Sequence, residues 1–146
     1  PILSYGSQVW SSYLAKDIAT VERVQRRFTK SIRGLRELDY KSRLLDLKAL
    51  SLQKHRIYTD MILVYKALHG KINCEPDDIG LTSSRSRTRG GHCGKLLQRR
   101  PPSAAAAGLF SFRAPSVWNK LPSNIINCHT LSDFKNKLMS YLVNNL

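Results

Sequence analysis

The residues most able to do chemistry are an adjacent carboxylate pair, Asp77 and Asp78. Paired carboxylates hold the divalent metal ions of polymerases and nucleases, so such a pair is the first place to look for catalysis. Here Pro76 precedes the pair and Gly80 follows it, a pattern that indicates a turn rather than the end of a buried strand. Paired acids in a turn are usually solvated or cap a helix, so we expect them to bind no metal.

Two neighbouring pairs of histidine and cysteine, His92–Cys93 and Cys128–His129, could together supply the four ligands of a tetrahedral zinc site. The paired ligands of zinc sites are usually separated by two to four residues, whereas these are adjacent, and adjacent side chains on a strand point to opposite faces. We therefore interpret their placement as fortuitous, an interpretation that elemental analysis of dialysed protein for zinc would test. The sequence also lacks a Gly-rich phosphate loop and a nucleophile elbow, so we expect no catalytic centre, no metal and no cofactor.

Charge is the property that sets this chain apart. Its 146 residues include 24 Lys and Arg against 10 Asp and Glu, which gives a formal net charge of +14. Such a chain is most readily neutralised by a polyanion, first of all nucleic acid and secondly an acidic membrane surface. A basic protein without a nucleic-acid partner is the alternative.

The sequence contains neither a membrane span nor a secretory signal. No run of about 18 apolar residues occurs, and residues 1–14 lack the basic and apolar regions of a signal peptide. With three cysteines, a disulfide framework is not expected. We therefore expect an intracellular protein, cytoplasmic or nuclear and not secreted.

The clearest predicted helix spans residues 16–36, where apolar residues recur every three or four positions. We expect these apolar side chains to face the core and the basic ones to form an outer stripe. The apolar positions are Ile18, Val21, Val24, Phe28, Ile32 and Leu35. The candidate nucleic-acid-binding residues on the stripe are Arg23, Arg26, Arg27, Lys30 and Arg33.

Two further helices complete a predicted bundle over residues 1–72. The second begins after Asp39 and spans residues 40–50, with Leu44, Leu45 and Leu47 facing inward. The third spans residues 52–69 with Ser51 as its N-cap. Apolar residues surround most of this third helix, so we expect it to be packed on two sides.

Residues 73–112 form a predicted basic arm, a loop or at best a pair of short strands. No acid occurs between Ile79 and Ser132, and Gly and Ser cluster at residues 81–94. Arginines alternating with hydroxyl residues suit a phosphate backbone without base specificity, although a solvated loop explains them equally well. The candidate binding residues here are Arg85, Arg87 and Arg89.

Residues 113–146 are predicted to hold a short helix, with Pro115 in its first turn, and a C-terminal helix. Thr130 and Asp133 approximate a capping box for the latter. Its expected buried face contains Leu131, Phe134, Leu138, Tyr141 and Leu142. Phe112 and Trp118 lie beside basic residues and could stack on unpaired bases, but packing of the C-terminal helix onto the bundle is the favoured interpretation.

Several short segments, in order along nearly the whole chain, resemble the region beyond the polymerase palm in reverse transcriptases of non-LTR (LINE-type) retrotransposons, particularly the jockey and chicken-repeat groups. The opening segment 2–10 resembles the one just after the palm, and segment 21–30 resembles the thumb helix. The other matching segments are 63–70 at the end of the central helix, 86–90 in the basic loop, and 118–122 and 134–138 in the closing part. The chain departs from the pattern around residues 90–108, with its alanine run and Pro101–Pro102.

The resemblance implies a thumb and C-terminal region that grips the template-primer beside the palm. The family's catalytic aspartates and its endonuclease domain lie outside the matching segments. We therefore expect a mainly α fold: a thumb-like bundle, a basic irregular arm and a C-terminal helix. The expected function is that of a non-catalytic fragment of an RNA-directed DNA polymerase. Its expected partners are RNA or an RNA–DNA duplex and the upstream palm, with a helical protein-interaction module or an inactive remnant of a decayed retroelement as alternatives.

Overall fold

The computed structural model describes residues 6–10, 14–84 and 94–145 of the chain. This part is mainly helical, as expected, and its only strand-like pairing is an antiparallel bridge between Ser83 and Leu96. Within the described residues the elements are α1 (Ser7–Trp10), α2 (Ala15–Ser31), α3 (Tyr40–Asp46), α4 (Leu52–Leu68), the 3₁₀ helix η2 (Pro76–Ile79), α5 (Ala104–Ala107), α6 (Phe110–Trp118), α7 (Ser123–Ile126) and α8 (Leu131–Asn145).

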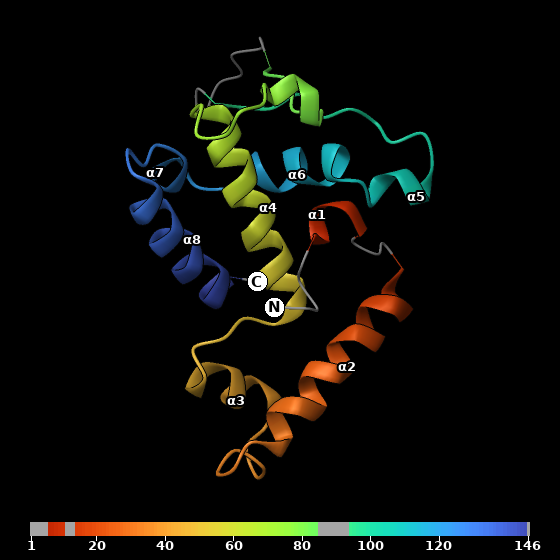
Figure 1. Cartoon of the computed structure of the whole chain (residues 1–146), viewed down its shortest axis with the longest axis vertical. Helices are drawn as coiled ribbons and strands as arrows, with labels where there is room; N and C mark the ends of the chain where they lie inside the picture. Colours follow the sequence, from red (N-terminus) through yellow and green to blue (C-terminus); the bar gives the residue numbers. More distant parts are fainter. Residues whose placement is uncertain (1–5, 11–13, 85–93, 146) are drawn as a thin grey trace.

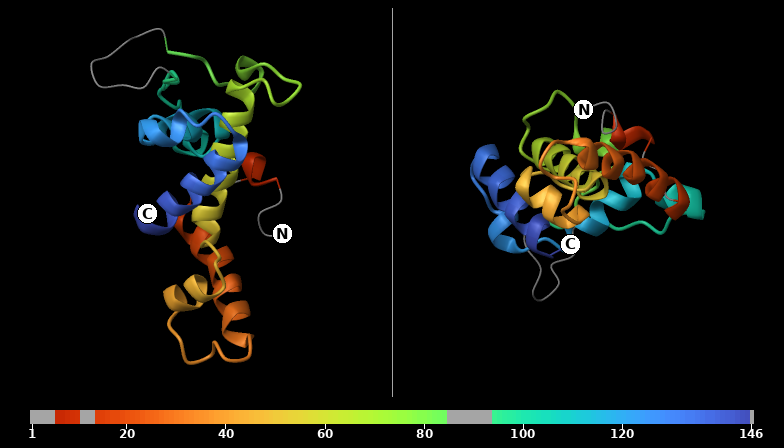
Figure 2. Two further views of the ribbon diagram at one scale, coloured as in Figure 1. Left: turned by 90° about the vertical axis from the view of Figure 1, so that its left-hand side faces the viewer. Right: turned by 90° about the horizontal axis from the view of Figure 1, so that it is seen from below.

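Helix α4 is the axis of the molecule. Helices α6 and α8 pack against it, while α2 and α3 extend from its N-terminal end, away from the other helices (Figures 1 and 2). As predicted, Ser51 caps α4 by accepting a hydrogen bond from the Lys54 backbone N–H at 3.3 Å. The contacts of α4 with α6 and α8 also cross residue 72, so the division of the chain there stays a prediction.

An aromatic cluster joins α4 to the C-terminal helices. The rings of Tyr65 and Phe134 stack with centroids 4.3 Å apart, and Trp118 lies 5.9 Å from Phe134. All three residues are fully buried, and each polar aromatic tip has a partner: Tyr65 Oη donates to the Cys128 carbonyl and Trp118 Nε1 to the Gly94 carbonyl. The packing interpretation of Trp118 is therefore confirmed.

The C-terminal helix matches its prediction closely. Thr130 Oγ1 accepts from the Asp133 N–H at 3.1 Å and donates to the Asp133 carboxylate at 2.8 Å. Three of the five residues expected on its inner face are fully buried, and the other two are partly buried against the same core. The fully buried ones are Phe134, Leu138 and Leu142.

Helix α2 ends five residues before the predicted position. Ile32 leaves the helix in an extended conformation, and Gly34 then takes a left-handed φ of 86°, so the chain turns back toward α3. Helix α3 begins just after Asp39, as predicted, and the Asp39 side chain caps it by accepting from the Lys41 N–H at 3.1 Å. The end of α3 also comes earlier than predicted, because Lys48 adopts a φ of 50° and breaks the helix.

The packing face of α2 differs from the predicted one. Val24 is 52 % exposed and Phe28 is 66 % exposed, so the expectation that they face the core is wrong. On α3, Leu44 is buried as expected, whereas Leu45 and Leu47 are exposed. The physical reason is that α2 and α3 project from the body, so fewer neighbouring elements cover them.

Polar residues fill the seam between α2 and its neighbours instead. Glu22 accepts hydrogen bonds from the backbone N–H of Leu52 at 3.0 Å and from the hydroxyl of Tyr40. Gln25 donates to the Leu50 carbonyl at 2.9 Å. Further along, the Thr29 hydroxyl accepts from Arg43 Nε at 3.2 Å, and both of these residues are buried.

Helix α6 begins before the predicted short helix, and Pro115 lies inside it rather than in its first turn. The proline is fully buried, so tertiary packing holds it in a position that its missing N–H disfavours. The side chain of Asn119, just after α6, fixes the arm: it accepts from the Leu96 N–H at 2.9 Å and donates to the Leu96 carbonyl at 2.8 Å. The described part of the arm is thus held against the body.

Candidate nucleic-acid interface

The basic stripe predicted on α2 is present on the surface. Arg23, Arg26, Arg27 and Lys30 lie on α2, and at ~100° per residue their side chains leave the helix within an arc of roughly 100°. Arg33 follows in the turn after α2, and all five residues are exposed. The four candidates on α2 therefore lie where the helical periodicity predicted, whereas Arg33, predicted on the same helix, lies beyond its end.

One member of the stripe is held in place by a ring. The guanidinium of Arg26 lies over the ring of Tyr40 at 4.6 Å from its centroid. Tyr40 is itself fixed by its hydrogen bond to Glu22, and burial together with that bond raises its pKa. Arg26 is thereby oriented by a cation–π contact, while in the described structure no acid bonds to Arg23, Arg27, Lys30 or Arg33.

The end of α2 and the following turn form a basic hollow of about 560 Å³. Arg27 and Lys30 from the helix line it together with Arg33 and Arg36 from the turn, and no acid is among its lining residues in the described structure. Cations at a helix C-terminus also interact favourably with the negative end of the helix dipole. The hollow therefore joins three predicted residues to Arg36, which was not among the candidates, and it can hold an anion such as a phosphate.

The second predicted basic group, Arg85, Arg87 and Arg89, lies outside the described residues. Next to that segment, Arg99 and Arg100 are exposed on the arm, and Arg99 donates to the Thr82 hydroxyl at 3.1 Å.

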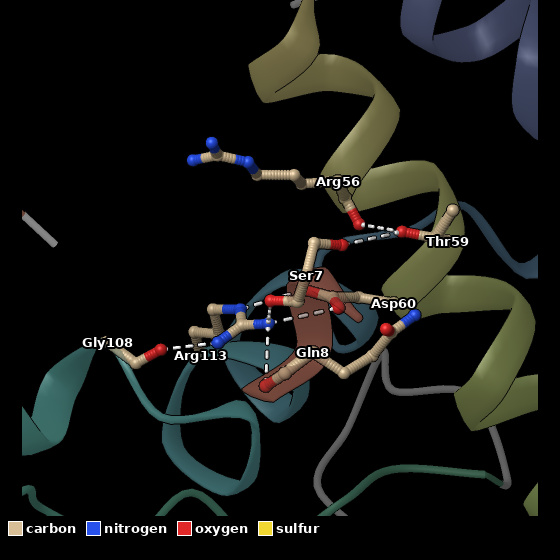
Figure 3. Close-up of polar contacts among 7 residues, drawn as sticks. All are labelled: Ser7, Gln8, Arg56, Thr59, Asp60, Gly108 and Arg113. Atoms are coloured by element: carbon tan, nitrogen blue, oxygen red, sulfur yellow. Dashed lines mark hydrogen bonds and ion pairs between the residues drawn. The ribbon is translucent and has the colours of Figure 1, made fainter. Parts of the chain in front are cut away.

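Arg113 directs its guanidinium toward α4 and bonds to protein groups there (Figure 3). Its Nε donates to one carboxylate oxygen of Asp60 at 2.8 Å and its Nη2 to the other at 3.1 Å. It also donates to the backbone carbonyls of Ser7, Gln8 and Gly108. One guanidinium thus joins α1, α4, the α5–α6 turn and α6, and we call Asp60 and Arg113 with these three carbonyls the arginine knot.

Burial dominates the electrostatics of the knot. Asp60 is only 3 % exposed, and its desolvation raises its pKa, although the hydrogen bonds and charge of Arg113 oppose the rise. Sequence reasoning missed this pair. The available signal was a lone aspartate inside a broadly apolar helix, because a buried carboxylate requires a cation or several donors.

The acids, cysteines and histidines considered for catalysis or metal binding lie in other parts of the chain. Asp77 and Asp78 lie in η2, where the Asp78 carboxylate accepts from the Glu75 N–H at 3.0 Å and Asp77 accepts from the Thr82 hydroxyl. The predicted turn is therefore confirmed. Cys128 is a buried free thiol and His129 is exposed, while His92 and Cys93 lie outside the described residues.

Comparisons with known protein families, curated proteins and solved structures returned no match. The arrangement on α2 can bind several phosphates by charge and by guanidinium hydrogen bonds, which fix position on a backbone without reading base identity. In the part of the chain that the structure describes, no helix has the length and hydropathy of a membrane span.

Proposed function

We propose that this chain is a non-catalytic fragment of a retrotransposon RNA-directed DNA polymerase that binds RNA or an RNA–DNA duplex through backbone phosphates. The observation that carries the proposal is the basic stripe of α2, on a helix that projects from the body (Figure 2). The five predicted cations are exposed, and three of them line a hollow together with Arg36.

The dimensions of the stripe suit several phosphates. Arg23 and Lys30 are seven residues apart, or roughly 10 Å along the helix axis at about 1.5 Å per residue. That distance corresponds to about three phosphates of one strand at about 3.4 Å per step. Arg33 and Arg36 extend the surface beyond the end of the helix. In this proposal the polymerase chemistry belongs to a palm upstream, and this segment holds the template-primer.

A salt titration with a fluorescent RNA–DNA duplex tests the proposal. If about five phosphates are neutralised, log affinity should fall with log salt at a slope of roughly 4 to 5. Between 50 and 200 mM salt that slope weakens binding roughly 500-fold. Affinity that ignores salt, or no binding at low salt, would refute it.

Charge reversal identifies the surface. Replacing Arg23, Arg27 and Lys30 with Glu should abolish most binding while the helical circular-dichroism signal remains. The matched control replaces three exposed lysines outside α2, Lys71, Lys120 and Lys137, with Glu. Both variants change the net charge equally, so a control that loses as much affinity would show only a general effect of charge.

A helical protein-interaction module is the second candidate, and the exposure of Val24 and Phe28 favours it. An unpartnered apolar pair beside a basic stripe suits a protein partner or the parent polymerase's own palm. If this candidate is correct, the triple charge reversal changes the affinity for the RNA–DNA duplex little, because the unmodified chain already binds that duplex negligibly.

A further inference from the structure

An apolar groove lies between α3 and the end of α8. Its volume is about 740 Å³, within the usual range for binding pockets of roughly 300–1,000 Å³. Leu45, which is 56 % exposed, forms one wall, and Val143, which is 38 % exposed, forms part of the opposite wall. The other apolar lining residues are Leu44, Ala49, Leu50 and Met139.

Lysines surround this groove. Lys41, Lys48 and Lys54 are among its lining residues, and no acid is among those that line it in the described structure. Lys54 Nζ donates to the Val143 carbonyl at 3.4 Å, so its ammonium group is held at the α8 side. The groove therefore combines aliphatic walls with an uncompensated positive rim.

The backbone at Lys48 supplies a second observation. Its φ of 50° lies in the left-handed region, where glycine is the usual residue after a helix. The turn is well bonded: the Lys48 N–H donates to the Leu45 carbonyl at 3.0 Å and the Ala49 N–H to the Leu44 carbonyl at 2.8 Å. A lysine is strained there, and such strain is typical of positions where the side chain has a use.

We propose that this groove docks an amphipathic helix of a protein partner, with aliphatic residues on its inner face and Asp or Glu at its flanks. Charge complementarity selects the partner, because three lysines surround walls that bind Leu, Ile or Val. Nucleic acid fits less well, since unpaired bases stack on aromatic or guanidinium planes. The aromatic residue among those that line the groove, Tyr40, already has the Arg26 guanidinium over its ring. The groove lies on α3 and α8, so this proposal stands independently of phosphate binding by α2.

The test uses the full chain and a fluorescein-labelled helical peptide of about 14 residues, with Leu at positions i, i+3, i+4 and i+7 and Glu at the others. One comparison peptide has Lys in place of every Glu, and a second has Ser in place of every Leu. The acidic Leu peptide should bind at least roughly tenfold more tightly than either of them. Equal binding of the Lys peptide would overturn the proposal.

Chemical-shift mapping shows where the peptide binds. Amide signals of α3 and the last turns of α8 should move, whereas those of α2 should not. Shifts confined to α2 would mean that the peptide only neutralises the basic stripe, and the proposal would fall. It would also fall if a single-stranded oligonucleotide moved the α3 and α8 signals more than the peptide does.

Two variants separate binding from folding. Leu45→Ser removes an exposed wall and should weaken peptide binding roughly fivefold or more without unfolding the protein. Lys48→Gly should relieve the backbone strain and raise Tm by about 3 °C, yet weaken binding several-fold. Lys71→Gln, just beyond the C-terminal end of α4, is the matched control and should leave peptide affinity unchanged. Unaltered affinity of both groove variants would refute the proposal.

Discussion

Replacing Arg113 with Met removes the cation of the arginine knot but keeps a long, unbranched side chain. Asp60, which is 3 % exposed, then loses both of its hydrogen bonds to the guanidinium. The carbonyls of Ser7, Gln8 and Gly108 lose a donor as well. Breaking a buried ion pair from one side costs about 3–5 kcal/mol. Because the Arg113 side chain is 18 % exposed and water can reach part of the site, we expect the lower end, about 3 kcal/mol.

A double-mutant cycle tests whether the loss comes from the pair itself. Asp60→Asn keeps the size of the side chain and one acceptor oxygen, and it should cost about 2 kcal/mol. The double variant leaves neither charge unpaired, so it should be more stable than the sum of the single effects predicts, with a coupling energy of about 2 kcal/mol. Urea unfolding followed by circular dichroism measures all four proteins.

The control for this cycle is Arg100→Met, which removes an exposed arginine and should change stability by less than about 0.5 kcal/mol. The pH dependence gives an independent check. Without Arg113, burial of Asp60 is opposed only by the charge of Arg56, so the folded pKa of Asp60 lies further above the unfolded value. Stability of the Arg113→Met protein should then be greatest where Asp60 is protonated in both states and should fall as the pH rises through the folded pKa. Additive single effects, or a pH profile parallel to that of the unmodified chain, would refute the ion-pair argument.

Two further tests concern other parts of the fold. Gly80→Ala should destabilise the protein by about 2–3 kcal/mol, because Gly80 has a φ of 76° and an added Cβ would lie 2.6 Å from Ser111 Cβ. Gly34→Ala should cost only about 1 kcal/mol, because Gly34 has a φ of 86° but an added Cβ would meet no atom within 4 Å. Equal losses of stability on thermal denaturation would contradict the steric argument. Tyr40→Phe should reduce the loss of stability at alkaline pH. Burial and Glu22 raise the folded pKa of Tyr40, so its contribution to the free energy of unfolding is complete below about pH 10, where the unfolded phenol keeps its proton. That contribution is lost as the pH rises toward the folded pKa. Urea unfolding between about pH 8 and 11 measures this slope, and parallel profiles for the two proteins would contradict it.

Local signals account for the elements that were predicted well. Ser51 and Thr130 cap α4 and α8 through hydrogen bonds to residues three positions on, so both helix starts can be read from neighbouring residues. Helix α6 was predicted too short because proline is a reliable helix breaker only where tertiary contacts do not oppose it. Pro115 is buried, and that burial depends on distant residues.

The candidate site likewise contains residues that local sequence could predict and residues that it could not. The stripe on α2 follows from the spacing of its residues along a regular helix, so its exposed positions were predictable. Arg113 could not be distinguished from the surface cations by sequence, since its partner Asp60 is 53 residues away. The aromatic residue Phe112 beside it left stacking on unpaired bases as an alternative to packing, whereas the Arg113 guanidinium is directed toward α4.

The wrong prediction of the packing face of α2 has a physical cause. Apolar periodicity predicts which face of a helix would gain most from burial, but a helix can also be held by polar residues that satisfy backbone groups elsewhere. Glu22 accepts from the first N–H of α4 and Gln25 donates to a carbonyl just before it, so α2 is fixed at the junction where α4 needs partners. Phe28 is consequently left exposed beside the basic stripe. A surface that combines exposed cations with an exposed aromatic is suited to binding, and α2 is therefore where both candidate functions have to be tested.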